Sequence, residues 1–186
     1  MDGTEDQKQK YLPKLAAGDI IGSFCLTEPN AGSDAKAVQT TAILDGNEYV
    51  LNGTKRYITN APRAGLYTVY ARTNPNDKNA SGVSAILVEA GTDGMTTGKT
   101  DKKMGQKGTL TSDVIFEDCR VPATQLLGHE EGMGFKTAMK VLDRGRLHLA
   151  AACVGMARRL IDDSLAYAME RKQFGKPISN FQLVQA

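Results

Sequence analysis

The sequence predicts an α+β fold in which a strand-rich middle part is flanked by helices. Between about Ser23 and Leu127 the apolar residues alternate or gather in about seven short runs, with no helical period between them. Such a pattern favours a small barrel or a sandwich of mostly antiparallel strands. From Gly132 onward the apolar residues recur with helical spacing. A chain of 186 residues is long enough to bury a substantial core.

The first predicted element is a short helix within residues 1–22. Thr4 and Gln7 have the spacing of a capping box, and Gly18 is a plausible end of the helix. Pro13 lacks a backbone N–H, so we expect it to end or kink this helix.

Strands are predicted wherever apolar residues alternate or cluster between turn signals. Asp45-Gly46 and Asn52-Gly53 are expected to form tight hairpin turns, because Asx-Gly pairs readily adopt the positive φ angles that such turns need. Residues 74–82 are rich in Asn, Asp and Pro, which indicates an exposed loop. The expected strands cover residues 24–26, 38–44, 48–51, 56–59, 66–72, 83–89 and 113–121.

The last part of the chain predicts a long amphipathic helix that ends at Gly175 and Pro177, followed by the start of another helix at residues 180–186. One face of the long helix carries a repeated apolar set that includes Leu149, Met156 and Leu160. A helix with such a face needs partners. We therefore expect the chain to be a piece of a larger protein, which self-associates or exposes this face when isolated.

Composition and charge exclude several classes of protein. With 23 basic and 21 acidic residues, the net charge of +2 gives no reason to expect nucleic acid or an anionic membrane as a partner. No apolar run is long enough to insert into a membrane, and the polar, acidic start of the sequence does not resemble a signal peptide, so we expect a cytoplasmic protein. Three widely separated cysteines and two histidines predict neither a disulfide framework nor a metal site.

Residues 25–37 form the first candidate site, because a predicted strand runs directly into a turn dense in hydroxyls and small residues. Gly32 lets backbone approach a ligand closely, and Thr27 and Ser33 can donate hydrogen bonds to an anion without adding charge. The alternative is an ordinary loop in which Ser33 and Asp34 only satisfy nearby backbone groups.

Residues 55–60 form the second candidate site. Tyr57 and Thr59 are two residues apart, so they share one face of a strand, and a ring beside a hydroxyl suits a flat heterocycle. The alternative is a cross-strand pair on the surface of the sheet.

The two segments together resemble signatures of the acyl-CoA dehydrogenase family, through Thr27-Glu28-x-x-x-Gly32-Ser33-Asp34 and the run 52–60. Further matches in the same order extend the resemblance over essentially the whole chain, at 104–106, 116–122 and 170–175. The resemblance implies the last helix of an N-terminal helical domain at residues 1–22, a middle β-barrel domain at 23–128, and the first helices of a truncated C-terminal bundle at 129–186.

The resemblance also implies an FAD cofactor and an acyl-CoA substrate. Tyr57 stands where most relatives carry tryptophan, and Thr59 would face the flavin's N5. Substrate would contact Ser33, Asp143 and Arg146. The alternative interpretation of Asp143 and Arg146 is a simple ion pair within one helix. The residues implied to bind FAD are Phe24, Cys25, Leu26, Thr27, Gly32, Ser33, Tyr57, Ile58 and Thr59, with Arg171, Gln173, Phe174 and Gln182 reaching the FAD of a neighbouring subunit in a homo-oligomer. Arg171 is alternatively a cation at the C-terminus of a helix.

In this family a glutamate removes the α-proton of the thioester while the β-hydrogen leaves as hydride to the flavin, giving a trans-2-enoyl-CoA. An electron-transfer flavoprotein or a similar acceptor would then take the electrons. Some branches place the base just before the arginine that matches Arg146, where this chain has Gly145. We therefore expect the base beyond Ala186 and no catalytic residue within this chain, with Glu28 structural. The alternatives are an acyl-CoA oxidase of the same fold and a flavin-free assembly module.

Overall fold

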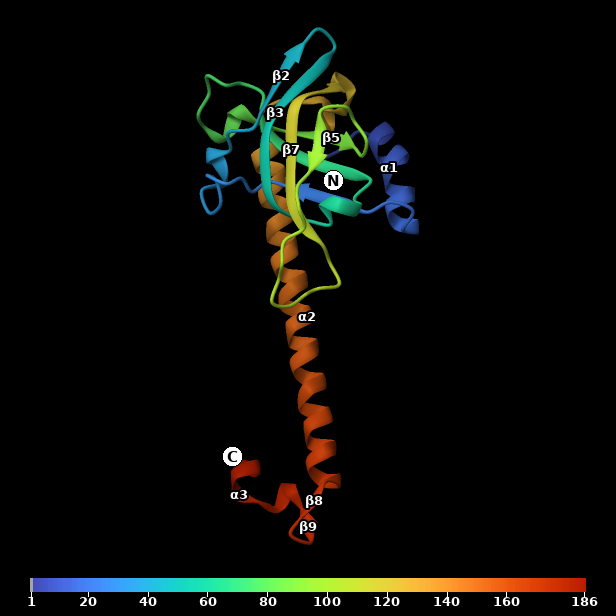
Figure 1. The fold of residues 1–186 in the computed structure, drawn as a ribbon, viewed down its shortest axis with the longest axis vertical. Helices are drawn as coiled ribbons and strands as arrows, with labels where there is room; N and C mark the ends of the chain where they lie inside the picture. The colour runs from blue at the N-terminus through green and yellow to red at the C-terminus, as the bar shows by residue number, and fades with distance from the viewer. Residues whose placement is uncertain (1) are drawn as a thin grey trace. The chain divides into compact units, whose positions relative to one another are not determined.

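The computed structural model describes residues 2–186. The chain divides into two compact units, the first reaching to Met139 and the second running from Lys140 to Ala186. Figure 1 shows the order of the elements along the chain, and each unit is described separately.

The first helix, α1 (Glu5–Ala17), begins with the predicted capping box. The Thr4 side chain accepts from the Gln7 backbone N–H at 3.2 Å, and the Gln7 side chain accepts from the Thr4 N–H at 3.1 Å. The helix ends as predicted at Gly18, which adopts a left-handed conformation. It does not end at Pro13, which lies inside the helix. The missing Pro13 N–H removes one hydrogen bond, whereas Tyr11 and Leu15 pack against the sheet and hold both sides of that position.

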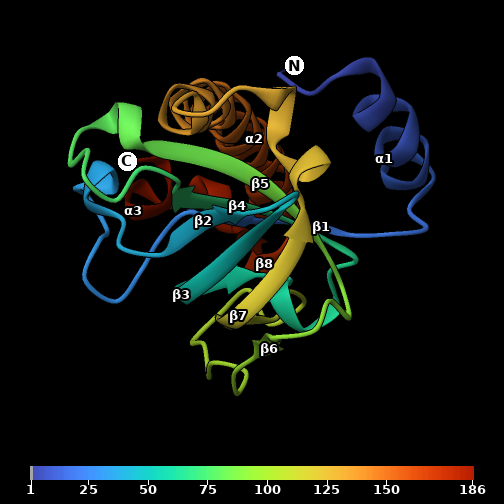
Figure 2. The ribbon, with the colours of Figure 1, turned by 90° about the horizontal axis from the view of Figure 1, so that it is seen from above.

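A seven-stranded sheet forms the bulk of the first unit. Its strands run in the order β1-β4-β2-β3-β7-β6, with β5 paired to β4, and the sheet curls into a half-barrel (Figure 2). The predicted fold class is confirmed, although β1 pairs with β4 in parallel and β2 meets β4 in parallel at Arg72. The strands are β1 (Gly22–Cys25), β2 (Thr41–Asp45), β3 (Glu48–Thr59), β4 (Leu66–Arg72), β5 (Val83–Glu89), β6 (Met95–Thr97) and β7 (Thr111–Pro122).

The Asp45-Gly46 turn joins β2 to β3 as predicted, but the prediction of a hairpin turn at Asn52-Gly53 is wrong. These two residues lie inside β3, so that the segments 48–51 and 56–59 form one strand. Gly53 adopts a φ of 144° at a shift of register against β7, and an added Cβ would lie within 3 Å of Thr40. The Asn-Gly signal here marks an irregularity within the strand and not its end.

The strand expected over 38–44 begins only at Thr41. The backbone N–H groups of Gln39 and Thr40 donate to the two carboxylate oxygens of Glu28, at 2.6 and 3.0 Å. The N–H groups of these two residues are therefore held by a side chain, although the Thr40 carbonyl still accepts from the Arg72 N–H of β4 at 2.8 Å. Residues 35–37 form a short 3₁₀ turn, η1 (Ala35–Ala37).

The loop 74–82 is present as predicted and closes with η3 (Ala80–Gly82). Other 3₁₀ turns are η2 (Ala61–Arg63), η4 (Ala123–Gln125) and η5 (Leu127–His129). The main core lies within the curled sheet and includes Cys25, Leu51, Val69, Ile86, Val114 and Phe116. A smaller cluster of Tyr11, Leu66 and Leu87 packs α1 against the sheet.

The second unit contains most of α2 (Gly134–Glu170), then β8 (Lys172–Gln173), β9 (Lys176–Pro177), η6 (Ile178–Asn180) and α3 (Gln182–Gln185). The long helix is confirmed, but it ends at Glu170 and not at Gly175–Pro177. Phe174 and Gly175 both have positive φ, 51° and 78°, which is the geometry of a two-residue turn joining β8 to β9. Leu149, Met156 and Leu160 on α2 are all more than half exposed.

No helix among residues 2–186 combines the length and the hydropathy that crossing a membrane requires.

Candidate functional site

The two candidate segments lie side by side in the first unit. The Arg56 N–H donates to the Thr27 carbonyl at 2.8 Å, and the Ser23 hydroxyl donates to the Thr59 carbonyl at 2.8 Å. The Lys55 ammonium adds a bond of 3.2 Å to the carbonyl of Leu26. The end of β1 and the end of β3 therefore form one continuous edge, although they are separated by about thirty residues of sequence.

Glu28 lies beneath this edge as a structural anion. Its carboxylate accepts from Lys55 at 2.7 Å and from the backbone N–H groups of Gln39 and Thr40. Burial alone would raise the pKa of Glu28, but the Lys55 charge and these hydrogen bonds outweigh it and lower the pKa below 4.5. Burial lowers the pKa of Lys55, and Glu28 only partly opposes that effect. A carboxylate with both oxygens engaged and a lowered pKa is poorly suited to act as a general base.

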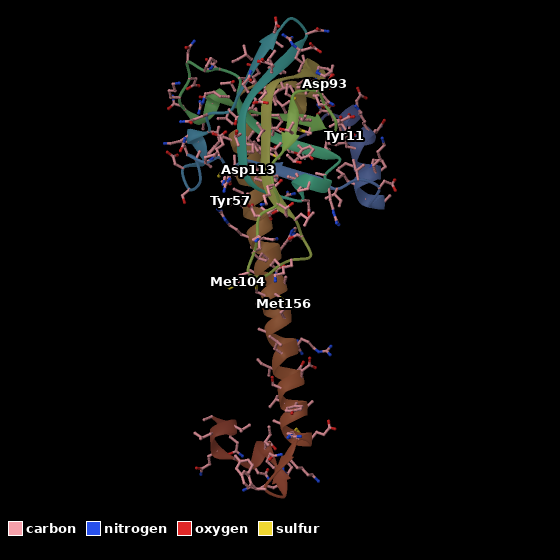
Figure 3. All side chains as sticks on the ribbon, in the orientation of Figure 1. Tyr11, Tyr57, Asp93, Met104, Asp113 and Met156 are labelled. Carbon is pink, nitrogen blue, oxygen red and sulfur yellow. The ribbon has the colours of Figure 1, made fainter. Side chains whose placement is uncertain are left out.

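Tyr57 stands at an irregularity in β3. The register with β7 shifts between Lys55 and Ile58, and Tyr57 adopts a φ of 58°, which is uncommon for a residue with a side chain. This bulge places the Tyr57 ring at the surface, where it is 62% exposed (Figure 3). The Arg56 guanidinium lies 4.8 Å from the centre of that ring and pairs with Asp113 of β7 at 2.6 Å.

Several predicted site residues present unused polar groups at the same edge. Thr27 is half-buried, and Gly32, Ser33 and Thr59 are exposed. Within residues 2–186 the hydroxyls of Thr27, Ser33 and Thr59 make no hydrogen bond, and the backbone N–H groups of Gly32 and Ser33 donate to no protein acceptor. A Cβ added at Gly32 would meet nothing within 4 Å. The edge is therefore open to a ligand that brings its own acceptors.

Other predicted residues have their side chains in the interior. Cys25, Leu26 and Ile58 are buried, and Phe24 packs on Tyr70 with ring centres 4.9 Å apart. Burial raises the pKa of the Cys25 thiol to about 12, so this cysteine remains protonated. These four residues offer a ligand mainly their backbone atoms.

The remaining predicted residues belong to the second unit. Asp143 and Arg146 form an exposed ion pair of 2.7 Å on α2, as the simpler interpretation predicted. Arg171 and Gln173 lie at the β8–β9 hairpin, and its turn residue Phe174 is 91% exposed. Gln182 begins α3.

Sequence reasoning missed the roles of Arg56 and Asp113. They are 57 positions apart, and the antiparallel pairing of β3 with β7, in which Lys55 lies opposite Val114, brings the Arg56 side chain to Asp113. The signal available was an arginine directly before an aromatic residue in a strand, which by itself predicts no contact. No cluster of three or more His, Cys, Asp or Glu suited to a metal ion occurs in the part of the chain that the structure describes.

Comparison with known proteins adds independent findings. Residues 23–119 match the model of the acyl-CoA dehydrogenase middle domain, and residues 132–186 match that of the acyl-CoA dehydrogenase C-terminal domain. The chain is 55% identical to the acryloyl-CoA reductase (NADH) of Anaerotignum propionicum over 185 residues, which covers 98% of this chain and 46% of the relative.

Two solved structures have the same fold. One, described as an electron transferring flavoprotein of Acidaminococcus fermentans, has a TM-score of 0.93 and 49% identity over 100% of this chain and 48% of that chain. The other, an acyl-CoA dehydrogenase complexed with FAD from Bacillus anthracis, has a TM-score of 0.91 and 43% identity over 100% of this chain and 31% of that chain. The chain thus spans about half the length of the curated relative. Together, the matches to both domain models and the shared fold show that this chain belongs to the acyl-CoA dehydrogenase family.

Proposed function

We propose that this chain carries the flavin-binding edge of an FAD-dependent enzyme that oxidises acyl-CoA thioesters to trans-2-enoyl-CoA. The observation that carries the proposal is the edge where Thr27 is bonded to Arg56 and Ser23 to Thr59. This edge carries the unused hydroxyls and N–H groups described above and the exposed ring of Tyr57. The FAD complex of the Bacillus anthracis relative supports the choice of cofactor. In this proposal residues 23–128 form the middle domain, between helical parts at 1–22 and 129–186.

The groups on this edge fit the chemistry of FAD. The free N–H groups of Gly32 and Ser33 are suited to diphosphate oxygens, because successive backbone amides in a turn form an anion-binding site. The Tyr57 ring supplies a flat surface for an isoalloxazine ring, and the hydroxyl of Thr59 supplies a hydrogen bond beside it. The charge of Glu28 is balanced, because this carboxylate is buried and paired with Lys55.

When bound, FAD supplies the redox chemistry by accepting a hydride. The protein groups orient the cofactor and the thioester, with Ser33, Asp143 and Arg146 proposed on the substrate side. Gly145 carries no carboxylate, and Glu28 is held by Lys55 and two backbone N–H groups. We therefore place the base that removes the α-proton beyond Ala186. We also propose that Arg171, Gln173, Phe174 and Gln182 reach the FAD of a second subunit in a homo-oligomer.

A second candidate is the reverse reaction, the reduction of a 2-enoyl-CoA. The 55% identity to an acryloyl-CoA reductase (NADH) favours it, because the same site and flavin serve both directions of hydride transfer. In either direction an electron-transferring flavoprotein is the proposed electron partner, which the likeness to the Acidaminococcus structure supports.

The experiment uses the natural full-length protein, purified without added flavin and then loaded with FAD. We expect visible flavin absorbance that bleaches when an acyl-CoA is added without oxygen, and product that co-elutes with a trans-2-enoyl-CoA. Oxygen uptake would favour the oxidase, and NADH-dependent loss of an enoyl-CoA would favour the reductase. A protein that binds no flavin would contradict the proposal.

Gly32→Ala tests the location of the cofactor. Gly32 has open space around its Cα and no positive φ, so we expect unchanged stability but at least about tenfold weaker FAD binding. Gly108→Ala is the matched control, because that glycine is equally open and exposed but lies outside the proposed edge. Equal FAD affinity in both variants would place the diphosphate elsewhere.

A further inference from the structure

We propose that Arg56 is a positioning residue that fixes the ring of Tyr57 against the flavin and makes the flavin easier to reduce through its positive charge. This inference rests on the proposed function, since it assumes that a flavin lies at the edge formed by residues 27–33 and 57–59. It concerns an arginine that the resemblance assigns no role.

The Arg56 guanidinium is held from two sides. It lies over the Tyr57 ring, 4.8 Å from its centre, and its Nη1 donates to Asp113 Oδ2 at 2.6 Å. A planar guanidinium can stack on an aromatic face while its N–H groups bind a carboxylate in the same plane, which an ammonium group cannot do. The guanidinium therefore links the ring of Tyr57, at the bulge of β3, to the carboxylate of Asp113 on β7.

Tyr57 needs this support because burial does not fix it. Its side chain is 62% exposed, and its backbone is held at a φ of 58° in the bulge. An exposed ring on a strand samples several rotamers, and ordering it on binding a ligand costs conformational entropy. Contact with Arg56 restricts the ring before the ligand arrives, so that less of that cost falls on binding.

Asp113 is fixed more firmly than an ordinary surface carboxylate. Its backbone carbonyl accepts from the Gly98 N–H at 3.0 Å, and its side chain is only 23% exposed. Its second oxygen, Oδ1, is buried and has no hydrogen-bond partner among residues 2–186. The charge of Asp113 is therefore balanced by its ion pair with Arg56.

The charge at this place affects the flavin by simple electrostatics. Reduction adds electrons to the isoalloxazine ring, and a nearby cation stabilises the more negative form. Arg56 lies against the ring of Tyr57, so its positive charge would lie near a flavin that contacts this ring. The negative charge of Asp113, which is paired with this guanidinium, opposes the effect.

The test measures the flavin midpoint potential and the visible spectrum of the FAD-loaded natural protein and its variants. We expect Arg56→Met to lower the ratio of reduced to oxidised flavin about tenfold at a fixed potential, which is about 30 mV for a two-electron couple. Asp113→Asn should shift the potential in the opposite direction, because it removes a negative charge and leaves Arg56 in place. Arg56→Lys should change the midpoint potential much less than Arg56→Met does, because it keeps the positive charge. It should still weaken FAD binding, because it removes the planar guanidinium that stacks on the Tyr57 ring.

Arg120→Met is the matched control. Arg120 is also an ion-paired arginine, bonded to Asp45 at 2.9 Å, but it pairs in register with Val50 at the far end of β3. We expect the flavin midpoint potential of Arg120→Met to equal that of the unaltered protein. If Arg56→Met does not fold, Arg56→Gln replaces it.

Three outcomes would overturn the inference. The first is an unchanged midpoint potential and spectrum in folded, FAD-loaded Arg56→Met. The second is a shift of the midpoint potential in the same direction in Arg56→Met and Asp113→Asn. The third is a shift in Arg120→Met as large as that in Arg56→Met. Failure of the unaltered protein to bind FAD would instead overturn the proposed function, and the inference with it.

Discussion

The ammonium group of Lys55 lies 2.7 Å from a carboxylate oxygen of Glu28, and the two side chains are 0% and 4% exposed. The pair crosses from β3 to the turn after β1, and Lys55 also binds the carbonyl of Leu26. A buried pair of this kind is not by itself a source of stability, because both charges lose their water. It does restrict how the two segments can be placed relative to each other, because a buried charge left without its partner is energetically costly.

Removing one partner of this pair should destabilise the protein strongly. We expect Glu28→Gln to lower the free energy of unfolding by about 3 to 5 kcal/mol, because it leaves the Lys55 charge buried without a counter-ion. Urea denaturation measures the change. Asp45→Asn is the control, since its ion pair with Arg120 is exposed and should be worth less than about 1 kcal/mol. Equal losses in the two variants would contradict the role given to Glu28.

The same pair predicts a pH dependence. The pKa of Glu28 lies below 4.5 in the folded protein, so its carboxylate contributes stability that is fully present above about pH 5 and is lost as the pH falls through the folded pKa. The difference in unfolding free energy between the natural protein and Glu28→Gln should therefore be constant near neutral pH and shrink in acid. Urea denaturation across a pH series measures it. A difference that grows as the pH falls would show the opposite sign of the pKa shift.

Gln7 is predicted to hold α1 to the turns that follow β7. Its buried amide donates to the carbonyls of Thr124 and Leu126, at 2.9 and 2.8 Å, and accepts from the N–H of Gly128 at 3.2 Å. Gln7→Ala leaves these backbone groups unsatisfied, which should cost about 1 to 3 kcal/mol and increase hydrogen exchange in α1. Gln9→Ala on the exposed side of the same helix should have little effect. Equal exchange in both variants would contradict this anchoring.

Arg72 is predicted to hold two loops together. Its buried guanidinium donates to the carbonyls of Lys36 and Val38, at 2.7 and 3.2 Å, and to those of Asp77 and Asn79 in the loop 74–82. Arg72→Met removes the donor from all four carbonyls, so we expect a loss of about 3 kcal/mol and faster tryptic cleavage at Lys78.

Exposed Arg63→Met provides the comparison for Arg72→Met. Unchanged cleavage at Lys78 in Arg72→Met, or the same acceleration in both variants, would contradict the role of Arg72 in ordering this loop.

The sequence correctly predicted the features that depend on residues close together in the chain. The capping box at Thr4, the turn at Asp45-Gly46 and the alternation of exposed Tyr57, buried Ile58 and exposed Thr59 all follow from residues within a few positions. The period of two also predicts the ring and the hydroxyl on one face of the strand, and the structure leaves both Tyr57 and Thr59 exposed.

The features that sequence missed depend on residues far away in the chain. Gly53 lies within a strand because it pairs with Phe116 of β7, and the shift of register at Tyr57 depends on the same pair of strands. The early end of α2 depends on the turn at Phe174-Gly175, which looks like a helix terminator in the sequence but closes a hairpin. Neither a bulge nor the pairing of Arg56 with Asp113 follows from propensity alone.

A crystal structure of the natural full-length protein grown with FAD would test most directly where the cofactor binds. We predict the isoalloxazine ring in contact with Tyr57 and the Thr59 hydroxyl, and the diphosphate over the N–H groups of Gly32 and Ser33. Flavin bound elsewhere, with these groups facing only solvent, would contradict the account.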